Sequence, residues 1–136
     1  MTPARRVAYQ ILLRVHQGEF ASDLLHEEGA RLSKADGRLA TEIVMGCLRR
    51  QPQLDFLVAH YAGRPVAKLD IEVLLALRIA IYQLRFLERI PAHAAVSESV
   101  QLTRVARRAS AAGFVNAVLR KVDRTPVPWP DPATEL

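Results

Sequence analysis

The stretch DIEVLLALRIAIYQL, residues 70–84, decides the fold class of this chain. Leu74, Leu77, Ile81 and Leu84 follow the spacing of a helix, and further apolar residues widen their stripe. A helix that is apolar around most of its circumference lies at the centre of a domain. We therefore predict that the segment from about residue 70 to residue 87 forms a central helix around which the others pack.

The rest of the chain also shows helical spacing, without the alternation typical of strands. Ser33 and Asp36 form a capping-box-like start for the third helix, and Asp70 and Ser110 are the expected caps of the fifth and seventh. Gly46 lies inside the third helix, where we expect it to allow another helix to approach closely. These signals predict an all-α bundle of about seven helices. The other six are expected over about residues 4–17, 22–30, 34–50, 52–62, 92–107 and 111–124.

Length and composition place the chain among single globular domains. It has 136 residues, of which 50% are hydrophobic, too many for a disordered chain. No apolar run reaches the roughly 18 residues of a membrane span, and the start of the chain lacks the apolar region of a signal peptide. The single cysteine, Cys47, excludes an internal disulfide and a thiolate metal cluster. We expect a cytoplasmic protein.

The last dozen residues differ from the rest in composition. Four of the eight prolines, at positions 126, 128, 130 and 132, fall within seven positions. Alternating prolines favour an extended polyproline II conformation and exclude a helix. We predict a domain over residues 1–124, followed by a proline-rich linker over residues 125–136 toward a further domain.

The positive charge is concentrated near the end of the predicted domain. The chain carries a formal net charge of +5. Residues 104–124 contain six basic residues and one acidic residue, so this segment alone carries +5 (six minus one). Such a patch is typical of proteins that bind a polyanion such as RNA. A solvated helix face without a partner is the alternative that charge alone leaves open.

Sequence motifs for catalysis are lacking. No glycine-rich nucleotide-binding loop is present. The four histidines, at positions 16, 26, 60 and 93, lack the spacing that would place two metal ligands on one helical face. Cys47 lies among apolar residues, so we expect its thiol to have a raised pKa and to be unreactive. We predict no catalytic residue and no metal site.

Three segments in the same order resemble the signature blocks of NusB-type RNA-binding domains. They are LRIAIYQL (residues 77–84), RIPAHAAV (89–96) and GFVNAVLR (113–120), and the resemblance covers about residues 3–124. Within this superfamily, the chain is most similar to the first domain of RsmB (Sun/Fmu) type ribosomal RNA cytosine methyltransferases. The segments that favour this branch are DGRLATEIVMGCLR (36–49), followed by Leu54 and Asp55, then IPAHAAV (90–96) and PWP (128–130). Ser97, Gln101 and Thr103 depart from the residues common in the family.

The resemblance implies two α-helical sub-bundles and a role in binding RNA. It implies a targeting domain of an enzyme that forms 5-methylcytosine in small-subunit ribosomal RNA, with a methyltransferase domain in cis. S-adenosylmethionine and the paired catalytic cysteines would belong to that missing domain, so this chain would need no cofactor and would not be an enzyme by itself. The alternatives are a stand-alone NusB-type transcription antitermination factor, which binds leader RNA and a small ribosomal protein, and a helical protein-interaction domain without RNA affinity.

Three candidate RNA-binding residues come from the resemblance and the helix phase. Arg5 matches an arginine of the family's N-terminal motif, and the adjacent Arg6 is expected to face outward. Phe114 matches the aromatic residue of the third block, where it could stack on a base. Phe114 also fits the apolar stripe of its helix, and we expect the core to be its main environment.

The other candidates come from the basic segment. Asn116 and Arg120 are one turn apart and are expected on the same face of the last helix. Arg107, Arg108 and Lys121 would neutralise phosphates without reading the base sequence.

Overall fold

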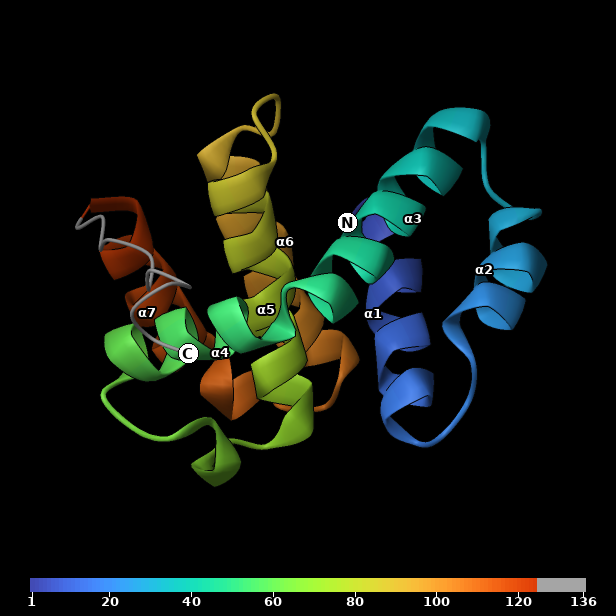
Figure 1. Cartoon of the computed structure of the whole chain (residues 1–136). Coiled ribbons are helices and arrows are strands. Elements are labelled where there is room, and N and C mark those ends of the chain that lie inside the picture. Colours follow the sequence, from blue (N-terminus) through green and yellow to red (C-terminus); the bar gives the residue numbers. More distant parts are fainter. Residues whose placement is uncertain (125–136) are drawn as a thin grey trace, which may run out of the picture.

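The computed structural model describes residues 1–124 of the chain, which form seven α-helices and two short 3-10 helices (Figure 1). The predicted all-α class and the predicted seven helices are confirmed for this part of the chain. The predicted linker, residues 125–136, lies outside the described residues. The α-helices are α1 (Pro3–His16), α2 (Ala21–Gly29), α3 (Lys34–Arg49), α4 (Gln51–Ala62), α5 (Ile71–Phe86), α6 (Ala92–Val105) and α7 (Ala112–Arg124), with η1 (Val66–Lys68) and η2 (Ala109–Ala111) between them.

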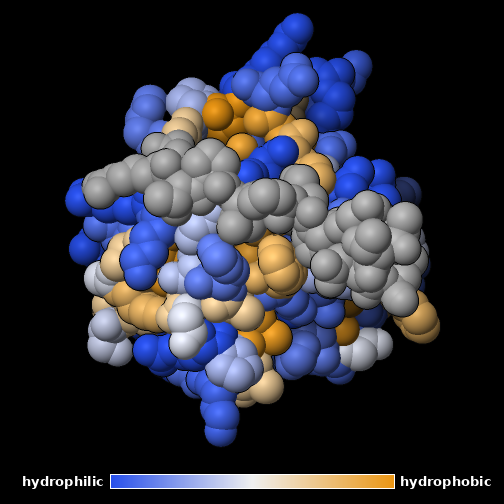
Figure 2. Space-filling model, turned by 60° about the vertical axis from the view of Figure 1, so that its left-hand side comes forward, coloured by the Kyte–Doolittle hydropathy of each residue, from blue (hydrophilic) through white to orange (hydrophobic). Residues whose placement is uncertain are grey.

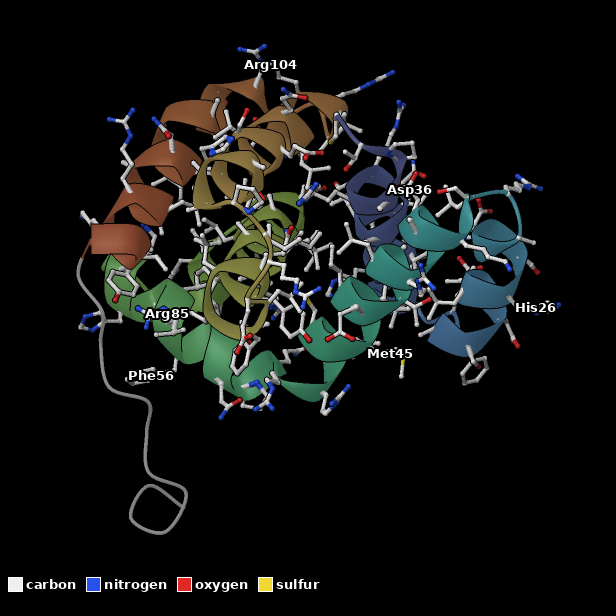
Figure 3. All side chains as sticks on the ribbon, turned by 90° about the horizontal axis from the view of Figure 1, so that it is seen from above. His26, Asp36, Met45, Phe56, Arg85 and Arg104 are labelled. Atoms are coloured by element: carbon white, nitrogen blue, oxygen red, sulfur yellow. The ribbon has the colours of Figure 1, made fainter. Side chains whose placement is uncertain are left out.

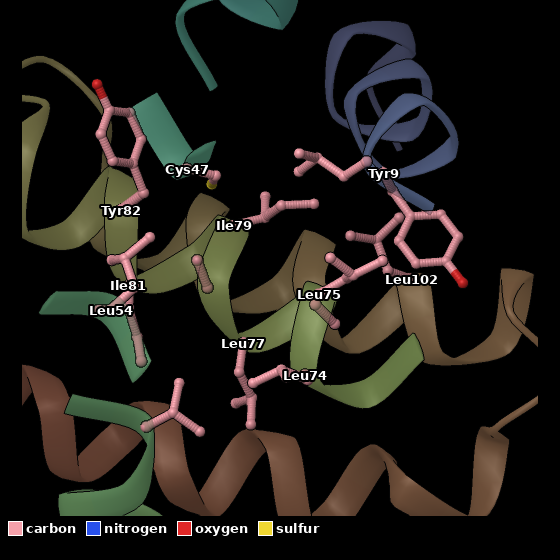
Figure 4. Close-up of a cluster of buried hydrophobic side chains, with 14 of the residues drawn as sticks. Tyr9, Cys47, Leu54, Leu74, Leu75, Leu77, Ile79, Ile81, Tyr82 and Leu102 are labelled. Atoms are coloured by element: carbon pink, nitrogen blue, oxygen red, sulfur yellow. The ribbon is translucent and has the colours of Figure 1, made fainter. Parts of the chain in front are cut away.

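Helix α5 is the centre of the fold, as its apolar circumference predicts. It contacts α1, α3, α4, α6 and α7 (Figure 1). Helices α1, α2 and α3 pack on one another, while α4, α6 and α7 pack with α5, which gives two sub-bundles joined along α5. Figure 4 shows Ile81 of α5 near Leu54 of α4, and Ile79 near Cys47 of α3, all of them buried. The two sub-bundles therefore share one core.

The crossing of α3 and α5 depends on Gly46. A Cβ atom at this position would overlap the ring of Tyr82, which comes from α5. The Tyr82 hydroxyl donates a hydrogen bond to Glu42, one turn earlier on α3. The expected close approach at Gly46 is thus confirmed, and an aromatic side chain is what fills the space.

The predicted helix caps have different outcomes. Ser33 caps α3, because its Oγ accepts a hydrogen bond of 3.1 Å from the Asp36 backbone N–H. Asp70 stands at the N-cap position of α5, but its side chain makes no capping bond and instead faces Arg108. The expectation that Ser110 caps α7 is wrong, because Ser110 lies inside η2 and α7 begins at Ala112. A cap needs the side chain aimed at the helix end, and a competing ion pair or an extra turn removes that geometry.

Two classes of structural feature are lacking in this part of the chain. Within residues 1–124, no helix has the length and apolar character that crossing a membrane requires. In the same range, no group of three or more histidine, cysteine or acidic side chains is arranged to hold a metal ion.

Candidate nucleic-acid interface

A groove runs between α6 and α7 and contains part of the predicted site. The two helices follow each other in the chain, are joined by η2, and pack side by side as an antiparallel hairpin (Figure 1). The groove has a volume of about 720 Å³. Its lining residues are Ala92, His93, Val96, Ser97, Val100, Gln101 and Arg104 of α6, and Ala112, Gly113, Asn116 and Arg120 of α7.

Small apolar residues and polar side chains together line this α6–α7 groove. Asn116 and Arg120 both line it, so the prediction that they share a face of α7 is confirmed. Gln101 and Arg104 line the groove from α6, and both are exposed. Figure 3 shows Arg104 pointing away from the body of the molecule. None of the eleven described residues that line the groove is acidic, so it offers a cationic and hydrogen-bonding surface.

Sequence reasoning did not select Gln101 and Arg104 as site residues. In the sequence, Arg104 is one of the six basic residues of segment 104–124, and Gln101 is a departure from the family pattern. Their positions three residues apart on α6 were a usable signal, because this spacing places two side chains on one helical face. The sequence alone does not show that this face of α6 lies opposite the face of α7 that carries Asn116.

The turn after α6 presents Arg107 and holds Arg108. Arg107 has a φ of 59°, in the left-handed region, and its side chain is exposed. The Arg108 backbone N–H donates to the Thr103 carbonyl at 2.6 Å, and the Arg107 N–H donates to the Arg104 carbonyl at 3.1 Å. These bonds close the end of α6 in a Schellman-type cap, in which glycine is the usual left-handed residue.

The charge of Arg108 is largely compensated. Its guanidinium lies 3.4 Å from a carboxylate oxygen of Asp70 and 3.4 Å from one of Glu72. Arg107 and Arg108 are adjacent, yet they differ as phosphate ligands, because only Arg108 has carboxylate partners assigned among the described residues. Arg107 is the stronger candidate of the two.

Phe114 lies on a different side of α7 from Asn116. Its ring is half-buried against the core, and the Arg64 guanidinium carbon lies 4.9 Å from the ring centroid. Residues around it include Lys68 and Asp70. Lys121 is exposed on the same α7, seven residues after Phe114, and so shares its helical phase. The predicted site is therefore divided between two faces of α7.

Arg5 is inside the fold, in contrast to a solvent-facing RNA ligand. Only 5% of it is exposed. Its Nε donates to Gln83 Oε1 at 2.7 Å, and its Nη1 is paired with Glu98. The neighbouring Arg6 is exposed, as the helix phase predicts. Of the two arginines, Arg6 is the one that solvent or a ligand can reach.

Figure 2 turns forward the side of the molecule that carries α7 and shows hydrophobic areas interspersed among hydrophilic residues.

Cys47 is buried inside the molecule, and burial raises the pKa of its thiol to about 12. The prediction of a raised pKa is confirmed, and a thiol of this kind is a poor nucleophile at neutral pH.

Comparison with known proteins identifies relatives along most of the chain. The sequence model of the NusB family matches residues 2–124. The chain is 33% identical over 130 residues to a probable ribosomal RNA small subunit methyltransferase B of Bacillus subtilis. The aligned region covers 93% of this chain and 29% of that relative. A protein named ribosomal RNA small subunit methyltransferase B from Erwinia tasmaniensis is 34% identical over 125 residues, with 91% and 29% covered. The chain thus spans less than a third of the length of these relatives.

Solved structures share the fold. NusB of T. maritima superposes with a TM-score of 0.80 at 22% identity, covering 93% of this chain and 94% of that one. A protein chain in the crystal structure of a plectonemic RNA supercoil superposes with a TM-score of 0.79 at 24% identity, covering 88% and 90%.

Proposed function

Since the chain belongs to the NusB family, we propose that it is the RNA-binding domain of a methyltransferase that forms 5-methylcytosine in small-subunit ribosomal RNA. The observation that carries this proposal is the unequal coverage of the relatives. Proteins named as ribosomal RNA methyltransferases match 93% of this chain but only 29% of their own length. This pattern is expected when the matched part is a module and the reaction is carried out elsewhere.

The described residues suit such a non-catalytic role. The buried Cys47 is the chain's single cysteine, and burial holds its pKa at about 12. The chain also lacks a glycine-rich cofactor loop. We propose that S-adenosylmethionine binds to a separate methyltransferase domain in cis, that ribosomal RNA is the partner, and that the protein works in the cytoplasm.

The surface through which RNA binds is cationic in this proposal. Exposed arginines lie on α1 (Arg6), at the end of α6 (Arg104 and Arg107) and on α7 (Arg120). Each arginine that neutralises a phosphate releases counterions from the RNA. The logarithm of the RNA affinity should therefore fall linearly with the logarithm of the salt concentration.

Titration of the chain with a fragment of small-subunit ribosomal RNA at several salt concentrations tests the proposal. We expect the slope to fall by about one for Arg107→Ala. Arg108→Ala should change it less, because Asp70 and Glu72 already compensate that charge. The chain should not transfer methyl groups when it is supplied with S-adenosylmethionine and RNA. Absence of RNA binding at low salt, or methyl transfer by the chain alone, would contradict the proposal.

A second candidate function is a stand-alone NusB-type antitermination factor that binds leader RNA and a small ribosomal protein. The match to T. maritima NusB, which covers 94% of that chain, favours it. Competition between leader RNA and ribosomal RNA separates the two, because the targeting domain should prefer ribosomal RNA. A preference for leader RNA that increases when a small ribosomal protein is added would favour the second candidate.

A further inference from the structure

We propose that the α6–α7 groove holds an unpaired RNA segment and reads its bases through Gln101 and Asn116. This inference rests on the proposed function and adds where, and by which groups, the RNA sequence is recognised.

Cationic side chains stand toward both ends of the groove, with two amides between them. Because α6 and α7 are antiparallel, Arg104 near the end of α6 and Gly113 near the start of α7 belong to one end of the groove, and Arg120 lies further along α7, toward the other end. Seven helical residues separate Gly113 from Arg120, which corresponds to about 10 Å along the axis. Gln101 and Asn116 occupy the middle, one from each helix. The groove thus offers a cation, two amides and a second cation in line.

This order suits a single nucleic-acid strand. Arginine guanidinium groups bind phosphate oxygens by two parallel hydrogen bonds. Side-chain amides both donate and accept, so asparagine and glutamine can pair with two atoms of one base edge. Valine and alanine side chains, at positions 96, 100, 112 and 92, provide an apolar surface for the face of a base.

An unpaired strand fits this arrangement better than a duplex. In an RNA duplex the base edges face a deep, narrow major groove that side chains cannot enter, and proteins bind the duplex mainly by its shape and backbone. The amides of Gln101 and Asn116 would then meet mainly 2′-hydroxyls and the minor-groove edges of paired bases, which carry little sequence information. Single-stranded segments expose their base edges. The absence of acidic side chains among the lining residues permits the phosphates to approach.

A matched pair of charge changes tests the position of the RNA. Gln101→Glu places a carboxylate in the groove, whereas Gln17→Glu makes the same change of net charge at an exposed residue at the far end of α1. Binding is measured with labelled decamers of adenylate, cytidylate and uridylate and with a duplex of the same length. We expect Gln101→Glu to weaken single-strand binding roughly tenfold, because the carboxylate repels nearby phosphates. The Gln17→Glu variant should stay within about twofold of wild type, since distant exposed charges are screened.

Loss of the amides tests base reading. Gln101→Ala with Asn116→Ala should reduce the ratio between the best-bound and worst-bound decamers by about fivefold or more, the discrimination that one bidentate contact supplies. Arg104→Gln and Arg120→Gln should weaken all decamers alike and reduce the salt slope by about one each. Thermal unfolding of every variant shows whether the fold is retained. Gln101→Glu changes an exposed side chain, so the charge comparison still tests the groove if the Asn116→Ala variant is unstable.

The outcomes separate this inference from the proposed function. If wild type binds no RNA, the proposed function fails and the groove proposal with it. If wild type binds RNA but Gln101→Glu and Gln17→Glu weaken it equally, the proposed function stands and the groove is not the RNA site. Tighter binding of the duplex than of every single strand would also overturn the groove proposal.

Discussion

Arg5 and Glu98 form an ion pair inside the molecule although 93 residues separate them in the chain. The same carboxylate accepts two hydrogen bonds of 2.7 Å from the backbone N–H and the hydroxyl of Thr2. Gln83 of α5 accepts a hydrogen bond of 2.7 Å from the Arg5 Nε and donates its own amide to the Ile79 carbonyl. The Arg5 Nη1 also donates to the Thr2 hydroxyl at 3.1 Å. This network fixes the start of α1 to both α5 and α6.

Arg5→Ala should destabilise the protein by about 3–5 kcal/mol, because it leaves the Glu98 carboxylate buried without its charged partner. The adjacent Arg6→Ala is the matched control, and it should change the free energy of unfolding by less than about 0.5 kcal/mol. Urea denaturation followed by circular dichroism measures both. Equal effects of the two variants would contradict the structural role assigned to Arg5.

Gly46→Ala should destabilise the protein by about 1–3 kcal/mol, the usual cost of adding a methyl group to a filled core. The new Cβ would overlap the Tyr82 ring, so α3 and α5 would have to separate. Gly113→Ala is the control, because nothing lies within 4 Å of a Cβ at that helical position. In thermal denaturation, Gly113→Ala should be as stable as wild type or more stable, with a gain of up to about 1 kcal/mol in the free energy of unfolding. A neutral Gly46→Ala would show that the contact is looser than described.

Arg107→Gly should be about 1 kcal/mol more stable than Arg107→Ala, because glycine adopts the left-handed conformation without the steric cost that any Cβ brings. Both variants lose the same charge, so both should bind RNA equally weakly. Denaturation measures the first difference, and RNA titration measures the second. If the two variants had equal stability, residue 107 would not need a positive φ in solution.

Stability should fall at alkaline pH because of Cys47. An unfolded thiol titrates near about pH 8.5, whereas burial raises the folded pKa to about 12. Between these values only the unfolded chain loses the proton, so its population increases with pH. Each pH unit should remove about 1.4 kcal/mol through this group.

The comparison with Cys47→Ala isolates this effect from the other groups that titrate at high pH. Wild type should lose about 2 kcal/mol more than the variant between pH 8.5 and pH 10.5 when both are unfolded in urea, because half of the unfolded thiol is already ionised at pH 8.5. Parallel pH profiles would show that the thiol is accessible to solvent in the folded state.

The sequence by itself determined the helices, the central place of α5 and the shared face of Asn116 and Arg120. These properties depend on spacing within one helix, where each residue's neighbours three or four positions away fix which side it occupies. The predicted phase also placed Arg6 outward, and the structure agrees.

Only the tertiary structure decided which charges are available. Arg5 turned inward because Glu98 and Gln83, from two distant helices, provide acceptors that offset its desolvation. Arg108 is paired with the carboxylates of Asp70 and Glu72 at the start of α5, so its charge is less available to a ligand. Asp70 faces Arg108 and makes no capping hydrogen bond to α5. Partners of this kind come from elements far apart in the chain, and helical periodicity contains no information about how those elements meet.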